Sequence, residues 1–299
     1  MDKLSFSSDI KQELNKNSNL ANKDIVKQEL IGYLLSGNTS AEKDKKIKFS
    51  TESDYNINRF SKLLTNLNIN HDINISGKTF CVTIKIKEIN WIEIKEDNII
   101  IKDKKEETQK TKESEEYQKA LIRGLFMGAG SINNPENKYH LEMIVANKES
   151  LQQIKTILEN LGIQIKTLQT KQKYSLYLKE GEEISKFLAL IGANKAVMQF
   201  EDIRIQREMR GKVNRLVNCE SANLNKTINA SIEQIAAIKK LKEMKKFNKL
   251  DDNLKEIANL RLENPDMSLI ELGKLLKNPV GKSGVNYRLK KIMEIANEQ

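Results

Sequence analysis

Hydrophobic and polar positions repeat along the first two hundred residues of the chain. "LIGYLLSGNTS" (Leu30 to Ser40) and "LIRGLFMGAGS" (Leu121 to Ser131) have equal length, the same apolar pattern and an offset of about 91 residues. The first is followed by "IKFST", "YNINRFSKLLTNLNI", "HDINIS" and "KTFCVTIKI", and the second by "YHLEMIVA", "KESLQQIKTILENLGI", "QIKTLQ" and "KYSLYLK". These periodicities predict two α/β halves, each in the order helix, strand, helix, strand, strand.

Small residues recur on one face of the first helix of each half. Gly32 and Ser36 lie four residues apart, as do Gly124 and Gly128. Side chains this small would let the two helix backbones approach closely, which would explain glycines that otherwise cost roughly 1 kcal/mol each relative to alanine. The alternative is that the glycines only cap helix ends, the role that we expect for Gly130.

The C-terminal segment predicts three helices. The first runs from Asn253 to about Glu263 and stops before Pro265. The second opens at Ser268, and Glu271 three residues later completes a capping box.

The third predicted helix starts near Ser283 and is basic. Its apolar side carries Val285, Leu289, Ile292 and Ile295. Because it follows a short helix and a tight turn, it completes a helix-turn-helix pattern, whose second helix enters the major groove N-terminus first. We expect Lys282, Ser283, Asn286 and Tyr287 to contact bases, and Arg288, Lys290 and Lys291 to contact phosphates. The alternative is an ordinary three-helix protein-interaction module.

Positive charge concentrates in residues 203–250, which hold twelve Lys or Arg against four Glu. This segment begins as an amphipathic helix, with Met209, Val213 and Leu216 or Val217 as an apolar stripe at helical spacing. A run of short polar side chains follows between Asn218 and Thr227, and because such residues favour turns and caps, we expect a break there.

Arg207 and Arg210 share a face of this helix with Asn214, away from the apolar stripe. Arginine and asparagine on one exposed face suit contacts to DNA phosphates. The alternative is a solvated face on a helix that caps the N-terminal domain.

The overall composition supports nucleic acid as the first partner to consider. The 299 residues carry a net charge of +10 and a pI near 9.3, which favours polyanions. No stretch resembles a signal peptide or a membrane span. Cys81 and Cys219 lie 138 positions apart without metal-ligand spacing, which argues for the reducing cytoplasm and against a zinc site or a disulfide framework. We expect no cofactor and no membrane partner.

The duplicated half resembles the LAGLIDADG homing endonucleases, in which two such helices pack together and paired sheets form a saddle over duplex DNA. In that family each helix ends on an acid, and the two acids share divalent cations. The matching positions here are Asn38 and Ala129, neither of which is anionic. Glu42 and Asp44 lie past the turn, and Glu136 lies in a loop. The resemblance therefore implies a nuclease scaffold without nuclease activity and without a metal.

The whole chain resembles the WhiA family, bacterial regulators of cell division and chromosome segregation that are named for sporulation. The most specific pieces are "NRLVNC…ANLNKT" and "SGVNYRL". This chain departs from the usual pattern at Gly281, often serine, and at Tyr287, often histidine, and either change could alter base preference. In some relatives the protein works with an iron–sulfur regulator and influences promoters.

Together these features predict an α+β chain: a duplicated LAGLIDADG-like α/β saddle domain followed by an all-α helix-turn-helix domain. The expected order is a helical lead-in (1–20), the saddle domain (21–200, halves 21–100 and 116–200, charged linker 101–115), a basic helical linker (201–250) and the helix-turn-helix domain (251–299).

The leading hypothesis is a cytoplasmic, nucleoid-associated regulator of cell division and transcription that binds duplex DNA and is not an enzyme. The first alternative is a divalent-metal nuclease, which needs the missing carboxylates. The second is a factor that docks on the division machinery or on a transcription-factor partner with little direct role for DNA.

Overall fold

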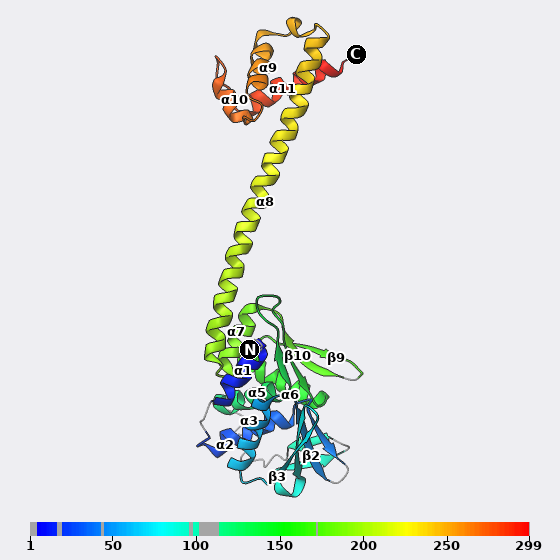
Figure 1. Cartoon of the computed structure of the whole chain (residues 1–299), viewed down its shortest axis with the longest axis vertical. Helices are drawn as coiled ribbons and strands as arrows, with labels where there is room; N and C mark the ends of the chain where they lie inside the picture. Colours follow the sequence, from blue (N-terminus) through cyan, green and yellow to red (C-terminus); the bar gives the residue numbers. More distant parts are fainter. Residues whose placement is uncertain are drawn as a thin grey trace. The chain divides into compact units, whose positions relative to one another are not determined.

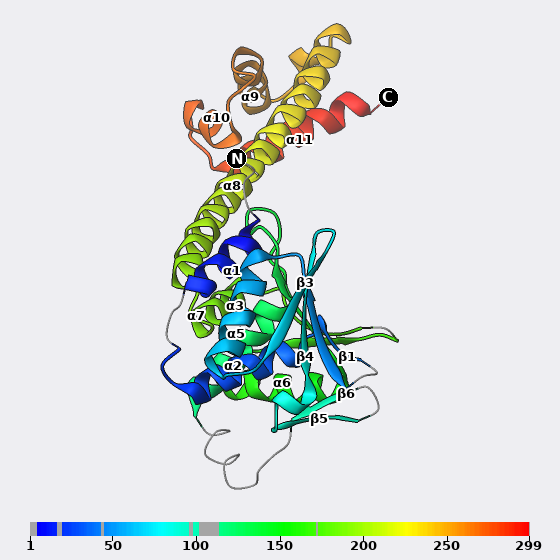
Figure 2. The same ribbon diagram turned by 60° about the horizontal axis from the view of Figure 1, so that its bottom comes forward.

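The computed structural model describes residues 5–16, 20–42, 45–95, 98–101, 114–171 and 173–298 (Figures 1 and 2). The chain divides into two units, Met1–Arg207 and Glu208–Gln299. Most of the predicted charged linker, 101–115, lies outside the described residues.

The first unit is built from two halves with matching elements. The first half contains α2 (Lys23–Leu34), β1 (Thr39–Glu42), β2 (Lys46–Thr51), α3 (Asp54–Asn66), β3 (His71–Ser76) and β4 (Thr79–Lys85). The second half contains α5 (Glu115–Ala129), β7 (Gly130–Ile132), β8 (Leu141–Val145), α6 (Lys148–Asn160), β9 (Lys166–Gln169) and β10 (Tyr174–Leu178). The remaining elements are α1 (Phe6–Lys16), η1 (Ile86–Glu88), the hairpin β5 (Ile92–Lys95) and β6 (Asn98–Ile101), and α7 (Gly181–Leu190).

The two four-stranded sheets have the same antiparallel topology, β1-β2-β4-β3 and β7-β8-β10-β9. The predicted duplication is therefore confirmed. The predicted order within each half was wrong by one strand, because β1 and β7 follow the first helix directly. They span only four and three residues, too few for an alternating pattern, and their pairing with β2 and β8 creates them. The β5–β6 hairpin was also missed.

An apolar core fills the space between each sheet and its helices. In β2 every second residue points inward, so Ile47 and Phe49 are fully buried. Phe49 packs against Phe60 and Tyr33, with ring centroids 4.5 and 5.4 Å away. Figure 2 shows helices α2, α3 and α5 on one side of strands β3 and β4. The alternation of buried and half-exposed residues along β2 thus decides which face of the sheet the helices cover.

Helices α2 and α5 pack with their backbones almost in contact. A Cβ atom added to Gly32 would lie 2.0 Å from the carbonyl oxygen of Leu121, and one added to Gly124 would lie 1.9 Å from that of Glu29. The two contacts are reciprocal, so the halves are related by an approximate two-fold axis that matches Gly32 with Gly124. The prediction that these glycines serve close helix packing is confirmed.

A buried ion pair lies at the same interface. Arg59 donates two hydrogen bonds to the carboxylate of Glu29, at 2.7 and 2.8 Å, and both side chains are 2% exposed. Arg123 approaches the same carboxylate at 3.4 Å. Because an unpaired buried carboxylate would be very costly, this network fixes α2 against both α3 and α5.

Lys11 on α1 is a half-buried cation whose charge opposes folding. Its Nζ atom lies 5.9 Å from the ring centre of Phe126, and burial lowers the pKa of Lys11 from 10.5 to about 8. Between these two pH values the unfolded chain binds more protons than the folded chain, so the free energy of unfolding rises as the pH increases.

We expect Lys11→Met to raise the melting temperature at pH 7 and to flatten this rise in the free energy of unfolding with pH. Thermal melts at pH 7 and pH 10 would measure both effects, and an unchanged pH dependence would contradict this assignment.

The second unit contains the C-terminal part of α8 (Asn194–Glu243), then η2 (Phe247–Lys249), α9 (Asp252–Glu263), α10 (Leu269–Leu275) and α11 (Lys282–Asn297). Its core joins α8 residues Ile238 and Leu241 to apolar residues of α9, α10 and α11. The predicted three helices are confirmed within one residue at their starts, and the capping box of Ser268 with Glu271 is present.

The predicted break between Asn218 and Thr227 was wrong, because α8 is helical through the whole run. The hydroxyl of Thr227 donates to the carbonyl oxygen of Asn223, one helical turn back, at 3.0 Å. That hydrogen bond lies inside the helix and does not compete with it. Short polar residues lower helix propensity but, without proline, do not stop a helix. Within the described residues, no helix has the length and apolar character needed to cross a membrane.

Candidate nucleic-acid interface

The turn before α11 is fixed by a glycine. A Cβ added to Gly273 would lie 2.2 Å from the carbonyl oxygen of Val280, and the amide of Val280 donates to the carbonyl oxygen of Gly273 at 3.2 Å. The amide of Lys277 donates to Glu256 on α9 at 2.7 Å. These contacts set the direction in which α11 leaves the turn.

Helix α11 has one buried and one exposed face. Val285, Leu289, Ile292 and Ala296 are buried in the core of the second unit. The predicted DNA-contacting residues lie on the rest of the helix: Lys282, Ser283, Tyr287, Lys290 and Lys291 are exposed, and Asn286 and Arg288 are half-buried. The structure therefore brings all seven onto one helix, and their contacts with DNA stay a prediction.

The N-terminus of α11 is suited to a phosphate. Its N-cap residue, Gly281, has no side chain to accept the first amides, and the first turn holds no acid. Free amides and the helix dipole favour an anion at this position, and Lys282 adds a positive charge. The backbone amides at this end can thus hold a phosphate, while the side chains of Lys282 and Ser283 stay assigned to the predicted base contacts.

Arg261 is a supporting residue that sequence reasoning missed. Its side chain is almost fully buried, and its Nη1 atom donates to the carbonyl oxygens of Asn264, Pro265 and Met267 at 3.4, 3.3 and 2.7 Å. Ser231 on α8 donates to the same Pro265 oxygen at 2.6 Å. The spacing held a signal, because Arg261 falls four residues after the buried Ile257, on the inward face of α9.

The basic part of α8 divides between the two units. Arg207 donates to the carbonyl oxygen of Pro135 at 2.6 Å, and its guanidinium lies 4.4 Å from the ring centre of Tyr139. Its predicted phosphate contact would have to replace these contacts, whereas Arg210 is exposed. The predicted apolar stripe is present but faces solvent, since Met209 and Val213 are 62% and 59% exposed.

The ends of α2 and α5 meet where a LAGLIDADG enzyme would hold its metal ions. When Gly32 is aligned with Gly124, Ala129 aligns with Gly37, and Asn38 is the next residue. The match of Asn38 with Ala129 was therefore off by one residue, because it aligned the apolar patterns from Leu30 and Leu121, which sets Gly32 against Arg123 and not against Gly124. Neither Gly37 nor Ala129 has a ligand atom in its side chain.

The side chains around this point do not fit a divalent cation. The amide of Asn38 donates to the carbonyl oxygen of Gly128 at 2.8 Å, so it closes the helix junction. Glu42 pairs with Lys48 at 3.7 Å, Glu136 is exposed in a turn, and Asp44 lies outside the described residues. Across the part of the chain that the structure describes, no three His, Cys, Asp or Glu residues are grouped as metal ligands would be.

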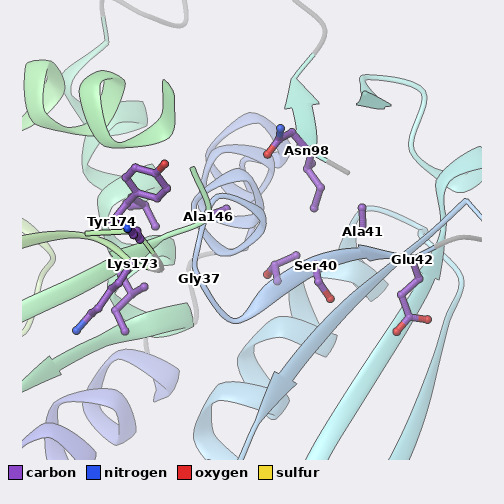
Figure 3. Close-up of a pocket in the computed structure, with 13 residues that line it drawn as sticks. Gly37, Ser40, Ala41, Glu42, Asn98, Ala146, Lys173 and Tyr174 are labelled. Carbon is purple, nitrogen blue, oxygen red and sulfur yellow. The ribbon is translucent and has the colours of Figure 1, made fainter. Parts of the chain in front are cut away.

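A cavity of about 790 Å³ lies beside these helix ends, within the first unit. Figure 3 shows Gly37, Ser40 and Glu42 on one side and Lys173 and Tyr174 on the other. Lys173 pairs with Glu142 at 2.8 Å. The lining offers hydroxyl, amide and amine groups with a single carboxylate, a set that suits hydrogen bonding better than cation binding.

We expect Asn38→Asp to lower the free energy of unfolding by about 0.5–1.5 kcal/mol, the net value of one hydrogen bond, because Asn38 is exposed. The carboxylate would face the Gly128 carbonyl oxygen, which now accepts a hydrogen bond, so an attraction becomes a repulsion. Urea denaturation at pH 7 would measure the loss. Asn38→Ala, which removes the donor without adding charge, is the control and should cost less than the aspartate. Equal stability of Asn38→Asp and the parent chain would contradict the hydrogen bond described here.

Two protein-family models match the second half of the first unit and most of the second unit. The model of the WhiA C-terminal HTH domain matches residues 213–296, and the model of the WhiA LAGLIDADG-like domain matches residues 118–210. The predicted fold class, an α+β chain with a LAGLIDADG-like saddle domain and a helix-turn-helix domain, is confirmed.

Two relatives are named probable cell division protein WhiA. The Clostridium acetobutylicum protein is 48% identical over 184 residues, which cover 62% of this chain and 58% of that protein. In that alignment the chain thus spans less than two thirds of the relative. The Clostridium novyi protein is 38% identical over 317 residues, which cover 99% of this chain and 98% of that protein.

Two solved structures have a similar fold. Full-length DUF199/WhiA from Thermotoga maritima superposes with a TM-score of 0.62 at 28% identity, over 98% of both chains. The N-terminal LAGLIDADG domain of DUF199/WhiA gives 0.53 at 23% identity, over 64% of this chain and 91% of that one. With both domains in this order and a 38% identical WhiA protein aligned along nearly its whole length, the chain belongs to the WhiA family.

Proposed function

We propose that this protein is a non-enzymatic DNA-binding regulator of cell division and chromosome segregation, associated with the nucleoid and acting at promoters or along the chromosome. The observation that carries the proposal is the exposed face of α11, with Lys282, Lys290 and Lys291 beside Ser283 and Tyr287. The names of the relatives support the role in cell division.

In the proposed complex α11 enters the major groove N-terminus first. Lys282 and Ser283 then lie nearest the bases together with Asn286 and Tyr287, while Arg288, Lys290 and Lys291 hold phosphates. Asparagine can form paired hydrogen bonds with adenine, and lysine can donate to guanine. Phosphate contacts supply affinity, and base contacts supply the choice of site.

We infer further that the first unit does not cleave DNA. Hydrolysis of a phosphodiester by the LAGLIDADG mechanism needs carboxylates that place the divalent cations, and Gly37, Asn38 and Ala129 provide none. The saddle then acts as a second DNA surface or as a docking surface for another protein.

A second candidate function is docking on a division or transcription protein with little direct role for DNA. The exposed apolar side chains of α8, among them Leu216 and Leu224 at 60% and 59% exposure, favour it. Large apolar patches on a protein surface commonly mark interaction sites.

A gel-shift experiment tests the proposal. The purified protein is incubated with fragmented genomic duplex DNA at two salt concentrations, with and without magnesium. Binding through phosphate contacts should weaken steeply as salt increases, and every fragment should stay intact. Magnesium-dependent cleavage that persists through further purification would overturn the non-enzymatic assignment. Absence of both shift and cleavage would favour protein docking.

A further inference from the structure

We propose that α8 carries a second DNA-contacting surface in the second unit, formed by Asn214, Asn218, Ser221, Asn225 and Asn229. We call this set the amide face. The inference rests on the proposed DNA binding through α11 and extends it to duplex beyond the α11 site.

The amide face is a continuous stripe on an uncovered helix. Its five residues follow one another at intervals of four, three, four and four, which keeps them on one side of an α-helix. All five are exposed. With a rise of 1.5 Å per residue the stripe is about 22 Å long, which is enough to follow a DNA groove for several base pairs.

Alanine at these five positions would stabilise the helix better than the residues present. Asparagine and serine are poorer helix formers than alanine. Across the residues that the structure describes, the five side chains of the amide face make no hydrogen bond with the protein. Their polar groups are thus available to an external partner.

The chemistry of the amide face fits base edges and phosphates. A carboxamide carries a donor and an acceptor side by side, the pair that adenine presents in the major groove, and serine can bond to any base. Because these side chains are short, the helix backbone could come close to the groove floor, as in DNA-binding proteins that insert a continuous helix.

Charge around the amide face suits a polyanion. Arg210 lies at its N-terminal end, and Arg215 and Lys226 lie on its flank. The face itself holds no acid. Glu208 pairs with Lys212 at 3.1 Å, and Glu220 falls on the opposite side of the helix by its spacing from Asn218 and Ser221. A surface that binds a protein has no general need to lack acidic residues, whereas a surface that binds DNA does.

The test compares two matched double variants of the full chain. Asn218→Ala with Asn225→Ala alters the amide face, whereas Asn223→Ala with Thr227→Ala alters the opposite side of the same helix. Both pairs favour helix more than the parent residues do, so loss of folding is not expected, and circular dichroism would verify this. The probe is a duplex recovered by the parent protein from genomic fragments, trimmed to about four or about two helical turns of DNA.

We expect the amide-face variant to bind the long duplex roughly tenfold or more weakly than the parent chain, and the control variant to bind like the parent. On the short duplex, centred on the α11 site, all three proteins should bind alike. Equal binding of both variants to the long duplex would overturn the inference while leaving the proposed function intact. Normal binding of the amide-face variant to the long duplex together with loss of its function in cells would also overturn the inference, and would indicate a protein partner. If the parent chain binds no duplex, the proposed function itself fails.

Discussion

Replacing Gly124 with valine is expected to lower the free energy of unfolding of the first unit by about 3 kcal/mol or more, the upper end for overpacking. Even the first added carbon would lie 1.9 Å from the carbonyl oxygen of Glu29. That atom belongs to a helix backbone, so no rotamer change can relieve the overlap and α2 must move away from α5. Urea denaturation followed by circular dichroism would measure the loss.

Two glycine substitutions are controls for this result. Gly128→Ala meets the Ser36 side chain, with its hydroxyl at 2.7 Å and its Cβ atom at 2.9 Å, and meets no backbone atom as closely as Gly124 does, so a smaller loss is expected. Gly211→Ala lies on exposed α8 with only the end of Arg215 nearby, at 3.5 Å, and should be neutral or stabilising. If Gly124→Val were no worse than Gly128→Ala, the close approach of α2 and α5 would be refuted.

The combined variant Lys282→Ala, Asn286→Ala and Arg288→Ala is expected to lose about 100-fold or more in affinity for a selected DNA site. Good contacts to bases contribute about 1–3 kcal/mol each. Loss of Arg288, the predicted phosphate contact among the three, should also reduce the dependence of log K on log salt by about one. Fluorescence anisotropy titrations at three salt concentrations would give both quantities.

The matched control is Lys240→Ala, Asn248→Ala and Lys249→Ala. These three residues are exposed in the same unit and do not belong to α11, and their loss removes the same charge and one amide. A control variant that lost as much affinity as the α11 variant would show that net charge, and not the α11 face, drives binding.

The parts of the fold that follow from local pattern could be predicted from sequence. The repeat of "LIGYLLSGNTS" and "LIRGLFMGAGS" indicated the duplication because the two helices pack against each other and therefore carry the same apolar pattern. In the second unit, Pro265, the Ser268 capping box and the apolar spacing of α11 set helix boundaries within one residue. The exposed side of α11 followed from the same spacing.

The parts that depend on distant contacts could not be predicted. β1 and β7 exist because β2 and β8 supply their hydrogen bonds. The match of Gly37 with Ala129 appears only when the reciprocal contacts of Gly32 and Gly124 are seen. The buried position of Arg261 depends on three carbonyl groups that point at it from one loop. The continuity of α8 through Asn218–Thr227 also ran against local propensity.

The reciprocal glycine contacts between α2 and α5 also bear on how the chain folds during synthesis. Gly32 leaves the ribosome 92 residues before Gly124 does, which at bacterial elongation rates is roughly five to twenty seconds. Throughout that interval the apolar side of α2 lacks the helix that covers it, although Glu29 can already pair with Arg59 of the same half. The first half is thus exposed to aggregation until the second half is made, and a nascent chain stalled before α5 should depend on chaperones.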